Sequence, residues 1–246
     1  MKKLTLALLL ALALTSMNVT AGVVDHDKMF DAYLNGDLAT WHNELLKYVK
    51  NPNLTFSDRC DIANYLYGYI GFIADDKSKK KTARYFMTFF ERYYEEMIKS
   101  PNYKSMGYLY KAGAYGMKSK IDGSVISNGT KSLSALSDAE DADPKNPLAI
   151  GLRGNVKFYA PGILGGDKKK AINYFLKAIK ILSVNTPKVY RWNYRALQLC
   201  VVEAYVQLGE KEKAEAYYQK VMKEVPNFKR LELAYETGEF GIADVD

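Results

Sequence analysis

The apolar residues of this chain recur with the spacing of amphipathic helices. In residues 167–182 the apolar positions follow one another at steps of four, three and four, which places them on one face of a helix. These positions are Ala171, Phe175, Ala178 and Leu182. Residues 210–225 repeat the pattern, and we find no convincing strand pattern, which would alternate apolar and polar residues. The sequence therefore predicts an all-α protein.

Glycine and proline mark the ends of the expected helices. A helix over 187–208 stops at Gly209, and the next one, over 210–225, stops at Pro226. Glycine readily adopts the left-handed conformation that ends a helix, and proline lacks the amide hydrogen that would continue one. Helices joined by so short a turn are predicted to form antiparallel pairs.

One spacing of residues occurs four times along the chain. It consists of a small residue, a large apolar residue four positions later and a further core residue three positions after that. The four sets are Ala83/Met87/Phe90, Ser132/Leu136/Ala139, Ala171/Phe175/Ala178 and Ala214/Tyr218/Val221. A single helix pair cannot bury its apolar face alone, so such units are expected to stack on one another.

The segment 198–226 resembles the tetratricopeptide repeat family. Tyr205 matches the aromatic residue of the first helix and Gly209 the turn, while Ala214, Tyr218 and Pro226 match the packing pair and the terminator of the second helix. The resemblance implies a right-handed α-solenoid of about four antiparallel helix pairs with terminal caps. It also implies that first helices line a concave groove, that second helices face outward, and that the protein binds a partner without catalysis.

The chain is expected to begin with a signal peptide over residues 1–21. Lys2 and Lys3 precede an apolar run over 4–14, and 19–21 supply small residues at the cleavage position. The alternative, a membrane anchor, needs roughly 20 apolar residues, and polar residues follow too soon. No cysteine lies near the cleavage position for lipid attachment, so we expect an exported, periplasmic protein without an integral membrane span.

The mature protein is predicted to be one helical repeat domain over residues 22–246. The expected divisions are a cap pair at 22–55, helix pairs at 56–104, 105–144, 147–186 and 187–226, and a tail at 227–246.

Two longer connections are expected within the repeats, at 118–128 and 159–167. The second contains Pro-Gly-x-x-Gly-Gly-Asp before a lysine-rich helix. It lacks the spacing of a phosphate loop and no strand precedes it, so we interpret it as a tight turn with Asp167 capping the next helix. This stretch also resembles one in the tetratricopeptide-like accessory component of tripartite periplasmic transporters.

Composition argues against several functions. The net charge of +7 becomes +5 without the two signal-peptide lysines, and the lysine runs are short, so nucleic-acid binding is not expected. His26 and His42 are expected at surface or interfacial positions, and no metal or catalytic motif occurs. Cys60 and Cys200 fall in different units and are interpreted as unpaired small apolar residues. We therefore expect no enzyme activity, no metal and no cofactor.

Tyrosine is the remaining functional signal, with 20 tyrosines against ten phenylalanines. Tyrosine combines apolar area with a polar tip and is common at recognition surfaces. The residues predicted to line the groove are Tyr65, Tyr69, Phe72, Tyr110, Met117, Asn155, Phe158, Leu199 and Glu203.

These features support two functional hypotheses. The first is an envelope scaffold that binds an unknown protein or peptide in a tyrosine-rich groove. The alternative is an accessory component of a periplasmic solute transport system that binds a small ligand or docks a solute-binding protein. An open groove with exposed aromatic residues would favour the scaffold, and a closed pocket would favour the alternative.

Overall fold

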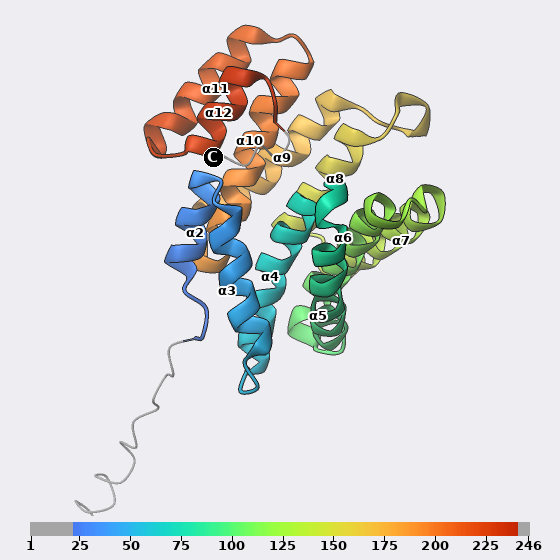
Figure 1. The fold of residues 1–246 in the computed structure, drawn as a ribbon. Coiled ribbons are helices and arrows are strands. Elements are labelled where there is room, and N and C mark those ends of the chain that lie inside the picture. Colours follow the sequence, from blue (N-terminus) through green and yellow to red (C-terminus); the bar gives the residue numbers. More distant parts are fainter. Residues whose placement is uncertain (1–21, 241–246) are drawn as a thin grey trace, which may run out of the picture.

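A computed structural model describes residues 22–240, and every regular element in that range is helical (Figure 1). The α-helices are α2 (His26–Asn35), α3 (Leu38–Lys50), α4 (Phe56–Ile73), α5 (Lys80–Ile98), α6 (Lys104–Asp122), α7 (Val125–Ala142), α8 (Pro147–Tyr159), α9 (Lys168–Val184), α10 (Arg191–Gln207), α11 (Lys211–Glu224) and α12 (Lys229–Thr237). Short 3-10 turns η1 (Lys77–Lys79), η2 (Pro101–Tyr103), η3 (Gly162–Leu164) and η4 (Lys188–Tyr190) precede α5, α6, α9 and α10. The fold is thus an all-α, repeat-like array, whereas the expected signal peptide lies outside the described residues.

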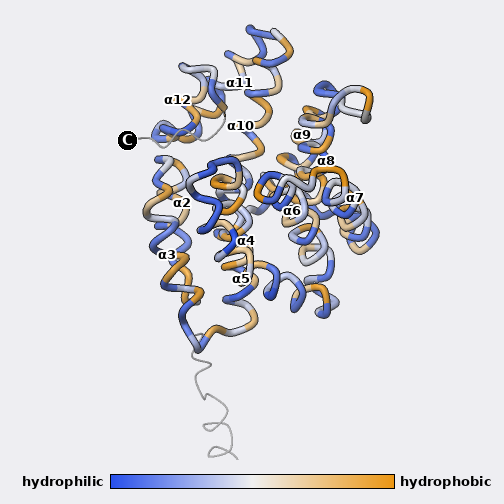
Figure 2. Tube along the Cα trace, turned by 45° about the vertical axis from the view of Figure 1, so that its right-hand side comes forward, coloured by the Kyte–Doolittle hydropathy of each residue, from blue (hydrophilic) through white to orange (hydrophobic). Residues whose placement is uncertain are grey.

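Consecutive helices form the pairs α2/α3, α4/α5, α6/α7, α8/α9 and α10/α11. The first pair lies within residues 22–55, and the next four follow the ranges anticipated for helix pairs, except that α6 begins at Lys104, one residue before the expected boundary. The segment 227–246 was expected to be a tail, but it contains α12, which packs against α2 and α11. Along each helix, hydrophilic and hydrophobic residues alternate, as expected where one face packs inward (Figure 2).

Capping residues explain several helix boundaries. Thr55 and Asp58 form a capping box at the start of α4. The Asp167 carboxylate accepts a hydrogen bond from the Lys170 amide at 3.0 Å, which confirms its predicted capping role. Gly123, with φ of 78°, ends α6 in the left-handed conformation.

The expected loop at 118–128 is not present. Helix α6 continues to Asp122 and α7 begins at Val125, so only two residues connect them. The polar residues of this segment extend α6 by one further turn, and Gly123 then allows an abrupt reversal. The connection at 159–167, by contrast, is the long loop that the sequence predicts.

The array curls so that its first and last elements meet. Helix α2 contacts α10, α12 and η4, and Figure 1 shows α12 at the upper end of α2. The Asp27 carboxylate pairs with Lys188 at 2.9 Å and also with Arg191. Deeper in the molecule, the Asn64 amide donates to the Val189 carbonyl at 2.7 Å. These contacts join residues more than 120 positions apart, which a strictly linear repeat array would keep separate.

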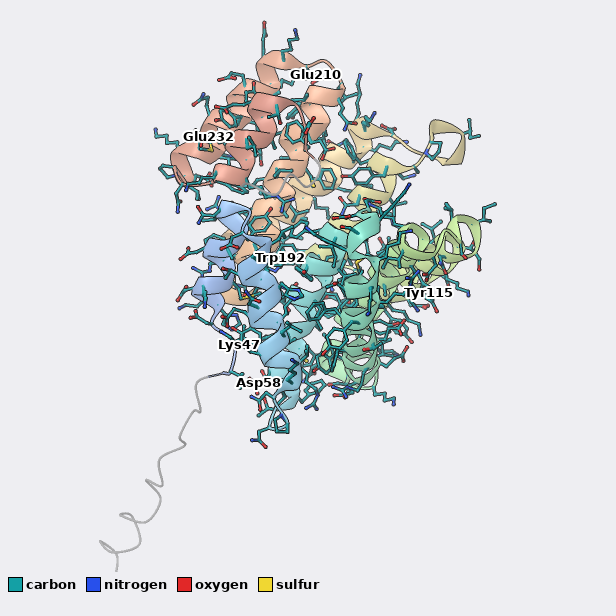
Figure 3. The ribbon with its side chains drawn as sticks, viewed as in Figure 1. Lys47, Asp58, Tyr115, Trp192, Glu210 and Glu232 are labelled. Atoms are coloured by element: carbon teal, nitrogen blue, oxygen red, sulfur yellow. The ribbon has the colours of Figure 1, made fainter. Side chains whose placement is uncertain are left out.

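A cluster of aromatic residues fills the centre of this closure. We call it the aromatic junction and define it as Tyr33, Trp41, Phe72 and Trp192, together with Gly68, against which both tryptophan rings pack. The two tryptophan rings meet edge to face, with centroids 5.5 Å apart. A Cβ atom on Gly68 would lie 2.7 Å from Trp41 and 2.8 Å from Trp192, so a glycine is required there. Figure 3 shows Trp192 near the middle of the molecule.

No helix among residues 22–240 is both long and apolar enough to cross a membrane.

Candidate functional site: the inner wall of the array

Most of the residues predicted to line an exposed groove lie in the interior. Phe72 and Asn155 are half-buried. The other seven are buried, namely Tyr65, Tyr69, Tyr110, Met117, Phe158, Leu199 and Glu203. The curling of the array explains this placement, because first helices that would face a groove in an open solenoid here pack against each other. A partner could reach most of these side chains only by displacing neighbouring helices.

The buried tyrosines keep their hydroxyl groups hydrogen-bonded. The Tyr65 hydroxyl lies 3.0 Å from His26 Nδ1, and the Tyr69 hydroxyl lies 2.8 Å from His42 Nδ1. Tyr110 donates to Asn64 Oδ1 at 3.1 Å. A buried hydroxyl without a partner costs stability, so these contacts explain how the core tolerates so much tyrosine. They also engage both imidazoles of the chain.

Tyr159, the last residue of α8, differs from these tyrosines. Tyr159 is 66% exposed to solvent. Nevertheless burial is the largest influence on its hydroxyl and raises its pKa, followed by the nearby Cys200 and Glu203. Protein atoms therefore surround the hydroxyl end of Tyr159, whereas much of the residue remains accessible to solvent.

Glu203 on α10 faces Tyr159 across this surface. It is 6% exposed, and burial raises the pKa of its carboxyl to about 7, although a hydrogen bond from Tyr159 and the charge of Lys168 oppose the shift. Gln207 donates to the same carboxyl at 2.9 Å. Glu203 has no ion pair within hydrogen-bonding distance among residues 22–240. A carboxyl in these surroundings changes its charge near neutral pH.

Two further side chains extend the surface. Burial raises the pKa of the Cys200 thiol to about 12, with Glu203 as the second cause. Burial, followed by Cys200, also raises the pKa of Tyr67 on α4 to about 12. One turn before Tyr159, Asn155 has a buried Oδ1 without a hydrogen-bond partner. We call this set, Tyr67, Asn155, Tyr159, Cys200 and Glu203, the inner wall.

Cationic groups flank the inner wall. The Lys168 ammonium lies 5.9 Å from the centroid of the Phe158 ring on α8. The Arg230 guanidinium of α12 lies 4.1 Å from the Phe72 ring and 5.2 Å from the Tyr33 ring, and its charge lowers the pKa of Cys200 against the effect of burial. Aromatic faces with cations nearby suit a ligand that is flat, apolar at its centre and anionic at its edge.

A pocket of about 250 Å³ lies elsewhere, at the N-terminal ends of α6 and α8. Its two buried polar side chains are already paired, since Asn146 donates to Ser105 at 2.9 Å and Ser105 donates to the Ala139 carbonyl at 2.8 Å. No group of three residues capable of holding a metal ion occurs in the described part of the chain. Both cysteines are free, in agreement with the interpretation that they are unpaired.

Sequence reasoning identified Asn155 and Glu203 but missed the rest of the inner wall. Tyr159 was placed in the loop that follows α8, although it is the last residue of the helix. Helical spacing could have located two of the missed residues. Cys200 lies one turn before the predicted Glu203, and Tyr67 lies between the predicted Tyr65 and Tyr69.

No family model matches the chain, and no curated protein matches it. The resemblance to tetratricopeptide repeats therefore depends on the residues quoted above. A solved structure, the HusA haemophore from Porphyromonas gingivalis, is similar to this chain with a TM-score of 0.52 and 15% sequence identity. The match covers 76% of this chain and 96% of the haemophore, so the two proteins share their helical fold.

Proposed function

We propose that this protein is an exported, non-enzymatic binding protein that holds a flat aromatic ligand against its inner wall. Export is supported by the signal-peptide pattern of residues 1–21. Both imidazoles are engaged by tyrosines, and burial holds the pKa of the Cys200 thiol at about 12, which opposes nucleophilic catalysis.

The observation that carries the proposal is the position of Tyr159. It is the most exposed tyrosine in the part of the chain that the structure describes, and its hydroxyl lies beside a buried carboxyl. An exposed aromatic ring loses apolar contact with water when a flat ligand stacks on it. The Oδ1 of Asn155 is buried without a partner and the Glu203 carboxyl already accepts from Gln207, so the ring of Tyr159 is the group that a ligand contacts first.

Haem or a related porphyrin is the first ligand to test. The similar solved structure bears the name of a haemophore, and a porphyrin has a flat apolar ring with carboxylates at its edge. Lys168 and Arg230 would donate hydrogen bonds to those carboxylates. Since the two histidines already have partners, binding here would depend on stacking rather than on an imidazole–iron bond. A metal-free porphyrin is therefore expected to bind about as tightly as haem.

A peptide or partner protein is the second candidate, as the sequence hypothesis of a scaffold anticipated. The unpartnered Asn155 Oδ1 favours it, because a backbone amide of an extended segment would satisfy that atom. In either case the protein could serve as an accessory that delivers its cargo to a transport system.

The test is a titration of the mature chain, residues 22–246, with haem and with protoporphyrin IX. Quenching of tryptophan fluorescence reports binding, because both tryptophans lie in the aromatic junction close to the wall. We expect saturable binding of both ligands and at least about tenfold weaker binding after Tyr159→Ala.

The matched control is Tyr85→Ala on α5, since Tyr85 is also exposed, at 40%, but lies outside the inner wall. An equal loss of porphyrin affinity in the Tyr159→Ala and Tyr85→Ala variants would refute the porphyrin proposal. The absence of saturable binding by the native protein would also refute it. Retention of a bound peptide in the absence of porphyrin binding would favour the second candidate.

A further inference from the structure

Helix α9 differs in charge from the other outward helices of the array. It carries five lysines and no acidic residue over 17 residues. Helices α5, α7 and α11, which are the second members of their pairs, each carry three acidic residues. Three of the α9 lysines stand in its first turn, where the helix dipole disfavours positive charge. This arrangement costs stability and therefore indicates a function other than folding.

The exposed residues of α9 form one stripe along the helix. Most of them recur at steps of three and four, which keeps them on one face over about 21 Å. The stripe consists of Lys170, Asn173, Lys177, Lys180, Ile181 and Val184, with Lys169 and Ser183 beside it. Within residues 22–240, no carboxylate forms an ion pair with Lys169, Lys177 or Lys180. These charges are thus available to an external anion.

The loop before α9 adds an apolar tip to this basic face. Ile163 is 95% exposed, and the loop that carries it projects from the body of the molecule (Figure 1). Backbone contacts hold its shape, since the Gly166 amide donates to the Pro161 carbonyl at 3.1 Å and Lys157 Nζ donates to the Gly165 carbonyl at 2.9 Å. A Cβ on Gly166 would lie 1.8 Å from the Ala160 carbonyl oxygen, so a glycine is needed to form this loop.

We propose that the outer face of α9, together with the Ile163 tip, docks on the surface of an anionic phospholipid bilayer. Lysines along an acid-free face attract a negative membrane surface, and single apolar side chains at the ends enter the headgroup region. Ile163 precedes the helix, whereas Val184, which is 86% exposed, ends it.

A bilayer fits this face better than a protein partner does. The apolar residues are isolated at the two ends instead of forming the central patch that a specific protein interface requires. Long lysine side chains reach a planar array of headgroups without needing a fixed geometry. The proposal concerns the outside of the array, so it does not depend on what the inner wall binds.

The test is sedimentation of the mature chain with vesicles of phosphatidylcholine containing 30% phosphatidylglycerol, compared with pure phosphatidylcholine vesicles. We expect binding to the anionic vesicles alone, and weakening by salt. The variant K169E/K177E/K180E should bind about 100-fold more weakly, because each lysine near such a surface contributes about fivefold.

The control variant, K211E/K220E/K223E on α11, changes the net charge by the same amount from exposed positions. It should retain most of the binding, and Ile163→Ser should weaken binding severalfold without altering the circular dichroism spectrum. Equal losses in the two triple variants would show a general charge effect and overturn the proposal. Failure of the native protein to bind anionic vesicles would also overturn it and would leave an acidic protein as the occupant of this face.

Discussion

The aromatic junction and the inner wall are neighbouring aromatic regions with opposite relations to solvent. In the junction, Trp41 and Trp192 are 1% and 4% exposed, and their rings meet edge to face. On the inner wall, Tyr159 is 66% exposed and faces a buried carboxyl. The junction joins elements from the two ends of the array, whereas the wall is formed by residues of α4, α8 and α10.

This difference shows that aromatic content alone does not mark a binding surface. Closure of the array converts most of its tyrosines into core residues with hydrogen-bonded hydroxyls. The residue left most exposed for recognition is Tyr159, which closure does not cover. Stability should therefore depend on the junction and binding on the wall, and the following experiments separate the two.

The largest effect is expected for Trp41→Ala. The Trp41 ring is buried against Gly68 and Trp192, and its Nε1 donates to the Met29 carbonyl at 2.7 Å. Its loss should lower the free energy of unfolding by about 3–5 kcal/mol, as measured by urea denaturation. Tyr159→Ala, on the wall, should lower it by only about 1 kcal/mol, through loss of the hydrogen bond to Glu203. Similar effects of the two variants would remove the distinction between junction and wall.

Glu203 should make stability depend on pH. Burial raises the pKa of its carboxyl from the ordinary 4.5 to about 7, so the folded protein binds this proton more tightly than the unfolded chain does. Its effect on stability is neutral below pH 4.5, becomes unfavourable as the pH rises from 4.5 to 7, and is constant above that. The predicted loss is about 3 kcal/mol.

Glu203→Gln provides the comparison, because it keeps the shape and cannot ionise. The free energy of unfolding of the native protein, relative to this variant, should fall by that amount between pH 4.5 and 8. A constant difference across this range would show that the carboxyl is not desolvated, and the inner wall would then be an ordinary wet surface.

The smallest effect is expected for the rates at which a thiol reagent modifies the two cysteines. Burial raises both thiol pKa values to about 12, so a thiol reagent should modify the folded protein slowly. Cys200 is half-buried on the wall and Cys60 is fully buried, so Cys200 should react several times faster. Mass spectrometry of the labelled peptides measures both rates in one sample. Faster labelling of Cys60 would contradict the placement of Cys200 on an accessible surface.

The sequence predicted the helix pairs well, because spacing, caps and breakers are local signals. Gly209 ends the first helix of the last pair and Asp167 caps α9, as expected. The prediction of a loop at 118–128 was wrong, because polar residues such as Lys118 and Lys120 are compatible with both a loop and an exposed helix. Only the φ value of Gly123 shows where the helix ends.

The candidate site was less predictable, because it depends on contacts between distant segments. The two ends of the array are joined by contacts that no local sequence pattern predicts. These are the ion pairs of Asp27 with Lys188 and Arg191 and the hydrogen bond from Asn64 to Val189. In an open array, helical spacing would place Tyr65 and Tyr69 in a groove. In the closed array both tyrosines are buried, and Tyr159 at the end of α8 is the exposed one.

Ligand protection of the two thiols tests the inner-wall proposal most directly, because Cys60 is an internal control within the same molecule. Labelling rates of the mature chain are measured with and without saturating protoporphyrin IX. We predict that the ligand slows modification of Cys200 severalfold and leaves Cys60 unchanged. An unchanged rate at Cys200 under saturation would place the ligand elsewhere and contradict the account.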